Sequence, residues 1–139
     1  MKIVIDASVA AAWFLPDEQA DYADSVLSAL PKTGAVAPPL FKLEIANVFT
    51  IAVRRGRIES WFRTNALDKL NRLHFEFDDK GYETVWQTVP DIADEFSLKI
   101  YDALYLELAQ RRNLQLATLD RKLIDAARKA GTVIFGVSG

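Results

Sequence analysis

The sequence predicts an α/β fold, a three-layer α/β/α arrangement with a short, mostly parallel central sheet and a large helical share. Two observations lead to this fold class. The chain opens with a β-branched apolar run at residues 2–5, and it closes with a β-α-β pattern over residues 115–135. Short apolar strands that alternate with helices pair in parallel and are covered on both faces. The 139 residues suit one domain, which we expect to span residues 1–139.

Between these ends, apolar residues recur at helical spacing, and short apolar runs separate the helices. Helices are expected at 17–30, 40–55, 58–73 and 98–112, with strands at 35–37 and 74–77. A turn at residues 31–34 ends the first of these helices. Residues 81–96 are expected to form a helix that is interrupted near Pro90, because proline cannot continue the upstream hydrogen-bond ladder. The closing pattern gives a strand at 115–118, a helix from about 121 to 129 and a strand at 132–135.

The composition excludes several kinds of catalysis. The chain has no cysteine and a single histidine, His74. Thiolate zinc sites, cysteine nucleophiles, disulfide frameworks and sites with two histidines are therefore excluded. A Ser-His-Asp triad would need His74, and no nucleophile motif lies near it in the sequence. Carboxylates that act with a hard cation remain as the expected chemistry.

The N-terminal sequence and the net charge limit the location and the partners of the protein. Asp6 comes too early for a signal peptide, and no apolar run approaches the roughly 20 residues of a membrane helix. We therefore expect a cytoplasmic protein, which the lack of cysteine fits. The net charge of -2 gives no global attraction to nucleic acid, so contacts with such a partner must come from local basic groups.

Two acids follow predicted strands of the sheet. Asp6 comes directly after the first strand, and Asp120 comes two residues after the strand at 115–118. In an open α/β sheet, ligands bind outside the carboxyl ends of the strands, so both side chains are expected at that edge. Each aspartate could instead cap the helix that follows it, a position for which aspartate is well suited. The two roles are compatible.

Two further acids lie on predicted helices that are apolar nearly all round. Asp102 lies in the segment 98–109, where a carboxylate is costly unless it is paired, protonated or bound to a cation. The alternative for Asp102 is a pair with Lys99, about one turn earlier on the same face. Glu44 lies on a narrow polar stripe with Asn47, about 60° away around the helix axis. That stripe could also be an ordinary solvated face.

Together, the four acids can converge at one edge of a parallel sheet. Four clustered carboxylates would raise one another's pKa unless a cation neutralised them. An all-oxygen site without histidine selects Mg²⁺ or Mn²⁺. Such sites polarise a phosphoryl oxygen and activate water for attack on a phosphodiester.

Four stretches of the chain carry a resemblance to a known family. They are residues 3–8 (IVIDAS), 43–48 (LEIANV), 101–109 (YDALYLELA) and 117–123 (ATLDRKL). In their order and spacing, which span nearly the whole chain, the sequence resembles the PIN domain, and within it the VapC-type toxins of type II toxin–antitoxin systems. The Tyr-Asp-Ala-Leu-Tyr stretch is a specific signal, whereas an acid after the first strand would be weak by itself.

The resemblance implies a PIN-like fold and a metal-dependent endoribonuclease that uses Mg²⁺ or Mn²⁺. The catalytic and metal-binding acids would be Asp6, Glu44, Asp102 and Asp120, the same four that burial and strand ends single out. Residues that orient a carboxylate or a metal-bound water by hydrogen bonds would be Ser8, Asn47 and Thr118. Ser8 and Thr118 could instead be turn residues, and Asn47 could be polar surface.

The resemblance also implies three partners: an RNA substrate, a cognate antitoxin protein and a second copy in a homodimer.

Basic residues that could contact phosphate are Arg54, Arg55, Arg57, Arg111, Arg112, Arg121 and Lys122. Arg54 and Arg55 equally suit a helix C-terminus. Trp13 and Phe14 are either core residues or part of a dimer or antitoxin surface. The acids Asp91 and Asp94 are expected on a solvated face.

Two other functions are compatible with the residues. One is a related nuclease that processes RNA or acts on structured DNA, although the short chain favours the toxin. The other is a non-catalytic Mg²⁺-binding switch domain. Such a domain would carry paired acids after its first strand, whereas Ala7 and Ser8 follow Asp6 here.

Overall fold

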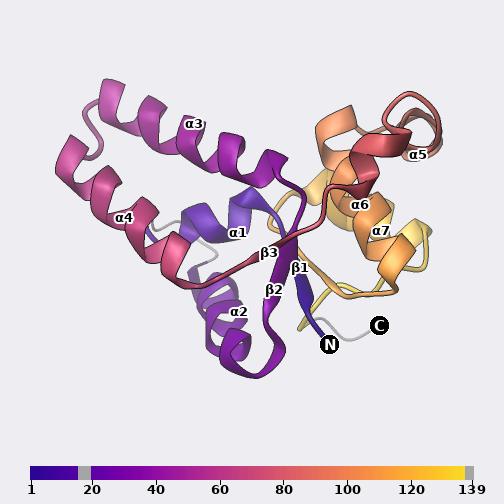
Figure 1. The fold of residues 1–139 in the computed structure, drawn as a ribbon, viewed down its shortest axis with the longest axis horizontal. Helices are drawn as coiled ribbons and strands as arrows, with labels where there is room; N and C mark the ends of the chain where they lie inside the picture. The colour runs from indigo at the N-terminus through magenta and orange to yellow at the C-terminus, as the bar shows by residue number, and fades with distance from the viewer. Residues whose placement is uncertain (16–19, 137–139) are drawn as a thin grey trace.

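A four-stranded sheet forms the centre of the protein, whose computed structural model describes residues 1–15 and 20–136 (Figure 1). Its strands are β1 (Ile3–Ile5), β2 (Ala35–Ala37), β3 (Glu76–Phe77) and β4 (Leu116–Ala117). They lie in the order β3-β2-β1-β4, and each neighbouring pair is parallel. The register aligns Val4 with Val36 on one side and with Leu116 on the other. The carboxyl ends of these strands therefore meet at one edge of the sheet.

Helices form the outer layers. They are α1 (Ala7–Ala12), α2 (Ala20–Thr33), α3 (Leu40–Arg54), α4 (Ser60–Arg72), the 3-10 helix η1 (Lys80–Thr84), α5 (Thr88–Phe96), α6 (Ile100–Arg112) and α7 (Arg121–Lys129). Figure 1 shows α1 to α4 gathered on one side of the strands and α5 to α7 on the other. The predicted α/β/α fold with a short, mostly parallel sheet is confirmed. No helix in the described parts of the chain is long and apolar enough to cross a membrane.

The central strands and α6 owe their burial to their apolar composition. All three residues of β1 and all three of β2 are buried, as expected for strands covered on both faces. Residues 103–109 of α6 are also all buried, and α6 packs against β1 and β4. The apolar circumference of residues 98–112 thus correctly predicts a buried helix, and Asp102, just before the buried run, is itself partly buried.

Two predicted boundaries at prolines are wrong, for different reasons. α2 continues through Pro31 to Thr33, and Leu30 in that last turn is buried in the core. The break expected near Pro90 lies earlier, between the end of η1 at Thr84 and the start of α5 at Thr88. Pro90 thus occupies the first turn of α5, where an N–H would have no partner within the helix.

Two other elements differ from the prediction. The strand expected at 132–135 is reduced to one parallel bridge between Leu116 and Ile134, and the neighbouring Val133 is 56% exposed. The helix α1 is not predicted as an element of its own, because it has only six residues. The predicted helix start at Asp17 lies outside the described residues.

Trp13 and Phe14 pack against the core, which is one of the two interpretations of these residues. The Trp13 Nε1–H donates a hydrogen bond to the carbonyl oxygen of Ala23 at 2.7 Å. The Phe14 ring meets the Phe49 ring edge-on, with the centroids 5.9 Å apart. Both side chains are partly buried, so they fasten the end of α1 to α2 and α3.

Candidate functional site

Asp6 is buried at the end of β1, with 5% of its surface exposed. It caps α1, because its Oδ1 accepts hydrogen bonds from the backbone N–H groups of Ser8 at 3.0 Å and Val9 at 3.3 Å. Burial raises the pKa of Asp6 to about 6, although hydrogen bonds from Ser8, Thr118 and Val9 oppose the shift. Asp6 is therefore both a helix cap and a buried carboxylate at the carboxyl edge of the sheet.

Two hydroxyl groups fix the orientation of the Asp6 carboxylate. Ser8 Oγ donates to Oδ1, and Thr118 Oγ1 donates to Oδ2. Each hydroxyl also accepts a backbone N–H from the segment after β4: Leu119 N–H binds Ser8 Oγ at 2.9 Å, and Asp120 N–H binds Thr118 Oγ1 at 3.0 Å. These bonds tie the end of β1 to the end of β4 and leave the Asp6 side chain little rotational freedom.

Asp120 caps α7 in the same way that Asp6 caps α1. Its Oδ1 accepts the backbone N–H of Lys122 at 2.9 Å, and the residue is partly buried. Its own backbone N–H is held by Thr118. The backbone of Asp120 is therefore positioned through the same hydroxyl group that binds Asp6.

Glu44 reaches the site from α3. Its Oε1 accepts a hydrogen bond of 2.6 Å from the hydroxyl of Tyr105 on α6. Burial raises the pKa of Glu44; the Tyr105 hydrogen bond opposes this rise, and the charge of Asp102 adds to it. Asn47, one turn further along α3, is exposed, and the described residues give its side chain no hydrogen bond to the four acids.

Asp102 lies in the first turn of α6 and is partly buried. Burial raises its pKa, the charge of Asp120 raises it further, and the ammonium groups of Lys99 and Lys122 oppose the rise. Within the described residues, neither lysine forms a salt bridge with Asp102. The pair with Lys99, which the sequence leaves open, is thus limited to a longer-range attraction.

The four acids share one region at the carboxyl edge of the sheet. The charge of Asp102 acts on Glu44, and the charge of Asp120 acts on Asp102. Tyr105 lies among them, since burial raises its pKa and the charges of Glu44, Asp6 and Asp102 raise it further. Within residues 1–15 and 20–136, however, no three Asp, Glu or His side chains lie close enough together to form a compact metal-binding cluster.

Known proteins resemble the chain in sequence and in fold. The family model of the PIN domain matches residues 3–129. The chain belongs to the PIN domain family. Ribonuclease VapC3 from Pyrobaculum aerophilum is 30% identical over 125 residues, which cover 90% of this PIN domain and 94% of the relative. The resemblance predicted from the sequence, to PIN domains and to VapC-type members, is confirmed.

Two solved structures share the fold of this PIN domain. The crystal structure of PAE2754 from Pyrobaculum aerophilum superposes with a TM-score of 0.69 at 23% identity, covering 91% of this chain and 84% of that one. A toxin–antitoxin complex from Klebsiella pneumoniae gives a TM-score of 0.57 at 18% identity, covering 86% of this chain and 87% of that one. At these identities the likeness shows the fold alone.

The donor set of this PIN domain fits a hard divalent cation. Its four acids offer only oxygen atoms, and none of them forms a salt bridge within the part of the chain that the structure describes. Burial raises the pKa of Asp6, Glu44 and Asp102, so the hydrogen bonds and charges of the protein compensate their ionised forms only in part. Carboxylate oxygens without protein cations are suitable ligands for Mg²⁺ or Mn²⁺.

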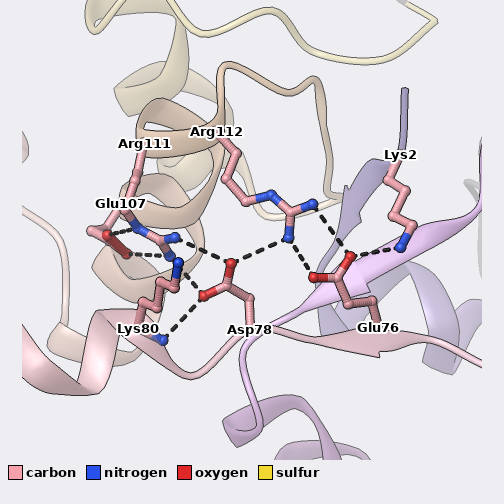
Figure 2. Close-up of polar contacts among 7 residues, drawn as sticks. All are labelled: Lys2, Glu76, Asp78, Lys80, Glu107, Arg111 and Arg112. Atoms are coloured by element: carbon pink, nitrogen blue, oxygen red, sulfur yellow. Dashed lines mark hydrogen bonds and ion pairs between the residues drawn. The ribbon is translucent and has the colours of Figure 1, made fainter.

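The basic residues of this PIN domain fall into two groups. Arg111 and Arg112 bind carboxylates at the C-terminal end of α6, away from Asp102 in its first turn (Figure 2). Exposed residues at the ends of helices are Arg54, Arg55, Arg57, Arg121 and Lys122. Of these, Lys122 influences the pKa of Asp102 and is the basic group tied to the site. The acids Asp91 and Asp94 are exposed on α5, as a solvated face predicts.

The sequence reasoning missed Tyr105, although the residue lies in the stretch that carries the resemblance. Tyr105 is 1% exposed, and its hydroxyl makes the contact between α6 and Glu44 on α3. The available signal was its burial: a tyrosine in a helix that is apolar all round needs a partner for its hydroxyl. Its position three residues after Asp102 puts both on one face of α6.

Proposed function

We propose that this PIN domain is a divalent-metal-dependent endoribonuclease and the toxin of a toxin–antitoxin pair. The observation that carries the proposal is the set of four acids that share one region at the carboxyl edge of the sheet and form no salt bridge within the described residues. Its similarity to Ribonuclease VapC3 over nearly the full length of both chains supports RNA as the substrate.

In this proposal the metal is Mg²⁺ or Mn²⁺. Asp6 and Asp102 would hold it directly, and Glu44 and Asp120 would complete the site through oxygen atoms or water. When bound, the cation would neutralise the carboxylates, polarise a phosphoryl oxygen and supply an activated water.

The protein's own groups would orient the acids. The hydroxyls of Ser8 and Thr118 hold both oxygens of Asp6, and the Tyr105 hydroxyl holds one oxygen of Glu44. Oriented carboxylates need less reorganisation when a charged phosphodiester binds. Lys122 and Lys99, both exposed, would attract the RNA backbone toward Asp102.

Histidine would take no part in the reaction. His74 is exposed and lines a cavity of about 320 Å³ between α3, α4 and β3, together with Phe41, Lys42 and Phe75. None of the four acids lines this cavity, so His74 lies outside the proposed site. Proton transfer would therefore fall to water and to the carboxylates.

The direct experiment is RNA cleavage with Mg²⁺, with Mn²⁺ and with EDTA. The wild type is expected to cut single-stranded RNA with either metal and to lose activity in EDTA, whereas Asp6→Asn and Asp102→Asn stay inactive with metal. Asp91→Asn is the matched control, because Asp91 is an exposed acid on α5. Cleavage that persists in EDTA, or full activity of both site variants, would refute the mechanism.

Toxicity and partners need tests in cells and in solution. The proposed antitoxin and homodimer rest on the similarity to VapC-type proteins; the solved neighbour from Klebsiella pneumoniae is a toxin–antitoxin complex. Expression without an antitoxin is expected to stop growth, and Asp102→Asn is expected to restore it. Harmless expression of an active wild-type enzyme would instead indicate a role in RNA processing. Sedimentation of the purified chain tests the homodimer.

A further inference from the structure

The cavity of about 320 Å³ between α3, α4 and β3 lies outside the proposed site, and the nuclease chemistry makes no use of it. Among the described residues that line it, all are apolar except Lys42, Asn71 and His74, and none is an Asp or Glu. A cavity of this size, with apolar walls and a few polar groups, is typical of a site for a small molecule with one or two rings.

Three phenylalanine rings form one wall of the cavity. Phe75 and Phe77 lie on the same face of the chain that enters β3, because alternate residues of an extended segment share a face. Glu76, between them, is not part of the wall and binds Arg112 instead (Figure 2). The rings of Phe41 and Phe75 are nearly parallel, with centroids 4.9 Å apart, and those of Phe75 and Phe77 are 6.1 Å apart. The wall is therefore a flat aromatic surface.

The backbone at His74 brings this wall against the helices. Figure 1 shows α4 running alongside α3 and leading into β3. His74 follows the end of α4 with a φ of 53°, and a left-handed residue at this position ends a helix and turns the chain. The turn lets Phe75 meet Phe41 of α3 and places the exposed His74 beside the cavity. Asn71, whose carbonyl oxygen accepts the His74 N–H at 3.3 Å, lines the cavity as well.

Lys42 gives the cavity a positive charge. Its Nζ lies 4.7 Å from the centroid of the Phe77 ring, which is a cation–π contact. The residue is exposed, and within the described residues its ammonium forms no salt bridge. An ammonium without an acidic partner, next to an aromatic wall, is complementary to an anion that carries a flat apolar group.

We propose that this cavity binds a small organic anion with a flat apolar body, such as an aromatic carboxylate. The ring packs against the phenylalanine wall, the carboxylate pairs with Lys42, and Asn71 and His74 donate hydrogen bonds to it. A nucleotide also joins an aromatic ring to an anion, but most of this wall is hydrocarbon and would leave the polar edge of its base unpaired. The site is separate from the four acids and does not depend on the proposed function.

The test is isothermal titration of the full chain with 2-naphthoate and with naphthalene-2-carboxamide. The two probes have the same shape, and only the first carries a negative charge. The naphthoate is expected to bind about 10-fold more tightly than the amide, because a hydrogen bond to a charged group is stronger than one to a neutral group. Adenosine 5′-monophosphate is the third probe and should bind more weakly than the naphthoate.

Two variants locate the binding. Lys42→Met keeps the apolar stem and removes the charge, so the affinity for naphthoate should fall to that for the amide, and the amide should bind as before. Leu67→Trp places a larger side chain in the cavity wall and should weaken both naphthalene probes. Lys69→Met is the matched control, because Lys69 is exposed on α4 and does not line the cavity.

Thermal melting checks that each variant is folded, and Lys42→Met decides the result if Leu67→Trp melts early, since residue 42 is exposed. The proposal is wrong if naphthoate does not bind the wild type, or if it binds Lys42→Met equally well. Unchanged binding to a folded Leu67→Trp would place the probe elsewhere and would also overturn it. Tighter binding of the nucleotide than of the naphthoate would show that the ligand class is wrong. Because no RNA or metal is used, none of these outcomes bears on the proposed nuclease.

Discussion

Two groups of carboxylates in this PIN domain have opposite electrostatic surroundings. The site acids are Asp6, Glu44, Asp102 and Asp120, and within the described residues none of them forms a salt bridge. The network acids are Glu76, Asp78 and Glu107, and each of them is paired with Lys2, Arg111 or Arg112 (Figure 2). Asp102, one of the site acids, lies in the first turn of α6, whereas the arginines of the network lie in its last turn.

The pKa directions follow from this difference. Burial raises the pKa of Asp6, Glu44 and Asp102. Hydrogen bonds from Arg112 and Lys2 lower the pKa of Glu76. Burial alone would raise the pKa of Asp78, but the Arg111 hydrogen bonds and charge outweigh it and the pKa is lowered. The network acids are thus stabilised in their ionised form by arginine or lysine, whereas the ionised site acids have no salt-bridge partner among the described residues; in our proposal a bound cation takes that place.

The largest expected effect follows from removing the charge of one site acid, and it is a loss of catalysis. Asp102→Asn keeps the size of the side chain and removes its charge, so RNA cleavage should fall at least about 100-fold, since a metal site contributes several kcal/mol. Stability should not fall, because Asp102 makes no salt bridge within the described residues and repels Asp120. Initial rates on a single-stranded RNA measure the loss, with Asp91→Asn as the control. Full activity in Asp102→Asn would mean that the acid lies outside the reaction.

The second prediction concerns pH in the metal-free protein. Because the pKa of Asp6 is raised from 3.8 to about 6 on folding, the folded state holds more protons than the unfolded state between these values. The free energy of unfolding should therefore fall as the pH rises through this window, by roughly 2–3 kcal/mol from Asp6. Glu76 and Asp78 act in the opposite sense: their lowered pKa values give stability that is lost as the pH falls below about 4.

Urea unfolding in EDTA, measured in steps from pH 4.5 to pH 7.5, tests the direction. The wild type should lose stability over this range, and Asp6→Asn should lose less of it, since the slope from Asp6 is gone. Glu44 and Asp102 contribute the remaining slope in the same direction, because their pKa values are also raised. Identical slopes in the wild type and in Asp6→Asn would contradict the assignment.

The positions of the site acids can be predicted from the sequence better than the ion pairs of the network acids. Asp6 can be placed because it follows a β-branched strand, and Asp102 because its helix is apolar nearly all round. Those signals are local, so one strand end or one helix periodicity is enough. The Tyr105–Glu44 bond joins residues 61 positions apart, and the Arg111–Asp78 bond joins residues 33 apart. Such contacts depend on how helices dock, which local patterns do not encode.

The same limit explains the errors in the fold. The strands β3 and β4 have two residues each, which is too short for an alternation to define their ends. Pro31 and Pro90 were expected to end or interrupt helices, yet packing of Leu30 and a position in a first turn accommodate them. Local propensity is overruled wherever tertiary burial contributes more free energy.

The third prediction breaks the network. Arg111→Met removes the partner of Glu107 and Asp78, whose side chains are only 8% and 7% exposed. The free energy of unfolding should fall by about 2 kcal/mol, less than for a fully buried pair because the Arg111 side chain is 30% exposed. Urea unfolding at neutral pH measures the loss. Arg54→Met, at the exposed end of α3, is the control, and equal stability of the two variants would show that the network adds little.

The smallest expected effect is a rise in thermal stability when metal is added. It should depend on the site acids and not on the network acids. A cation that binds only the folded protein raises the free energy of unfolding by about 1.4 kcal/mol at ten times its Kd. For a chain of this size that is an increase in Tm of about 4 °C. Mg²⁺ should give this shift in the wild type and in Arg111→Met, since the network acids already have cations, and a much smaller shift in Asp102→Asn. Differential scanning fluorimetry at matched ionic strength, with K⁺ replacing Mg²⁺ in the reference, measures it. Equal shifts in the wild type and in Asp102→Asn would remove Asp102 from the metal site, and a shift lost in Arg111→Met would mean that the cation depends on the network as well.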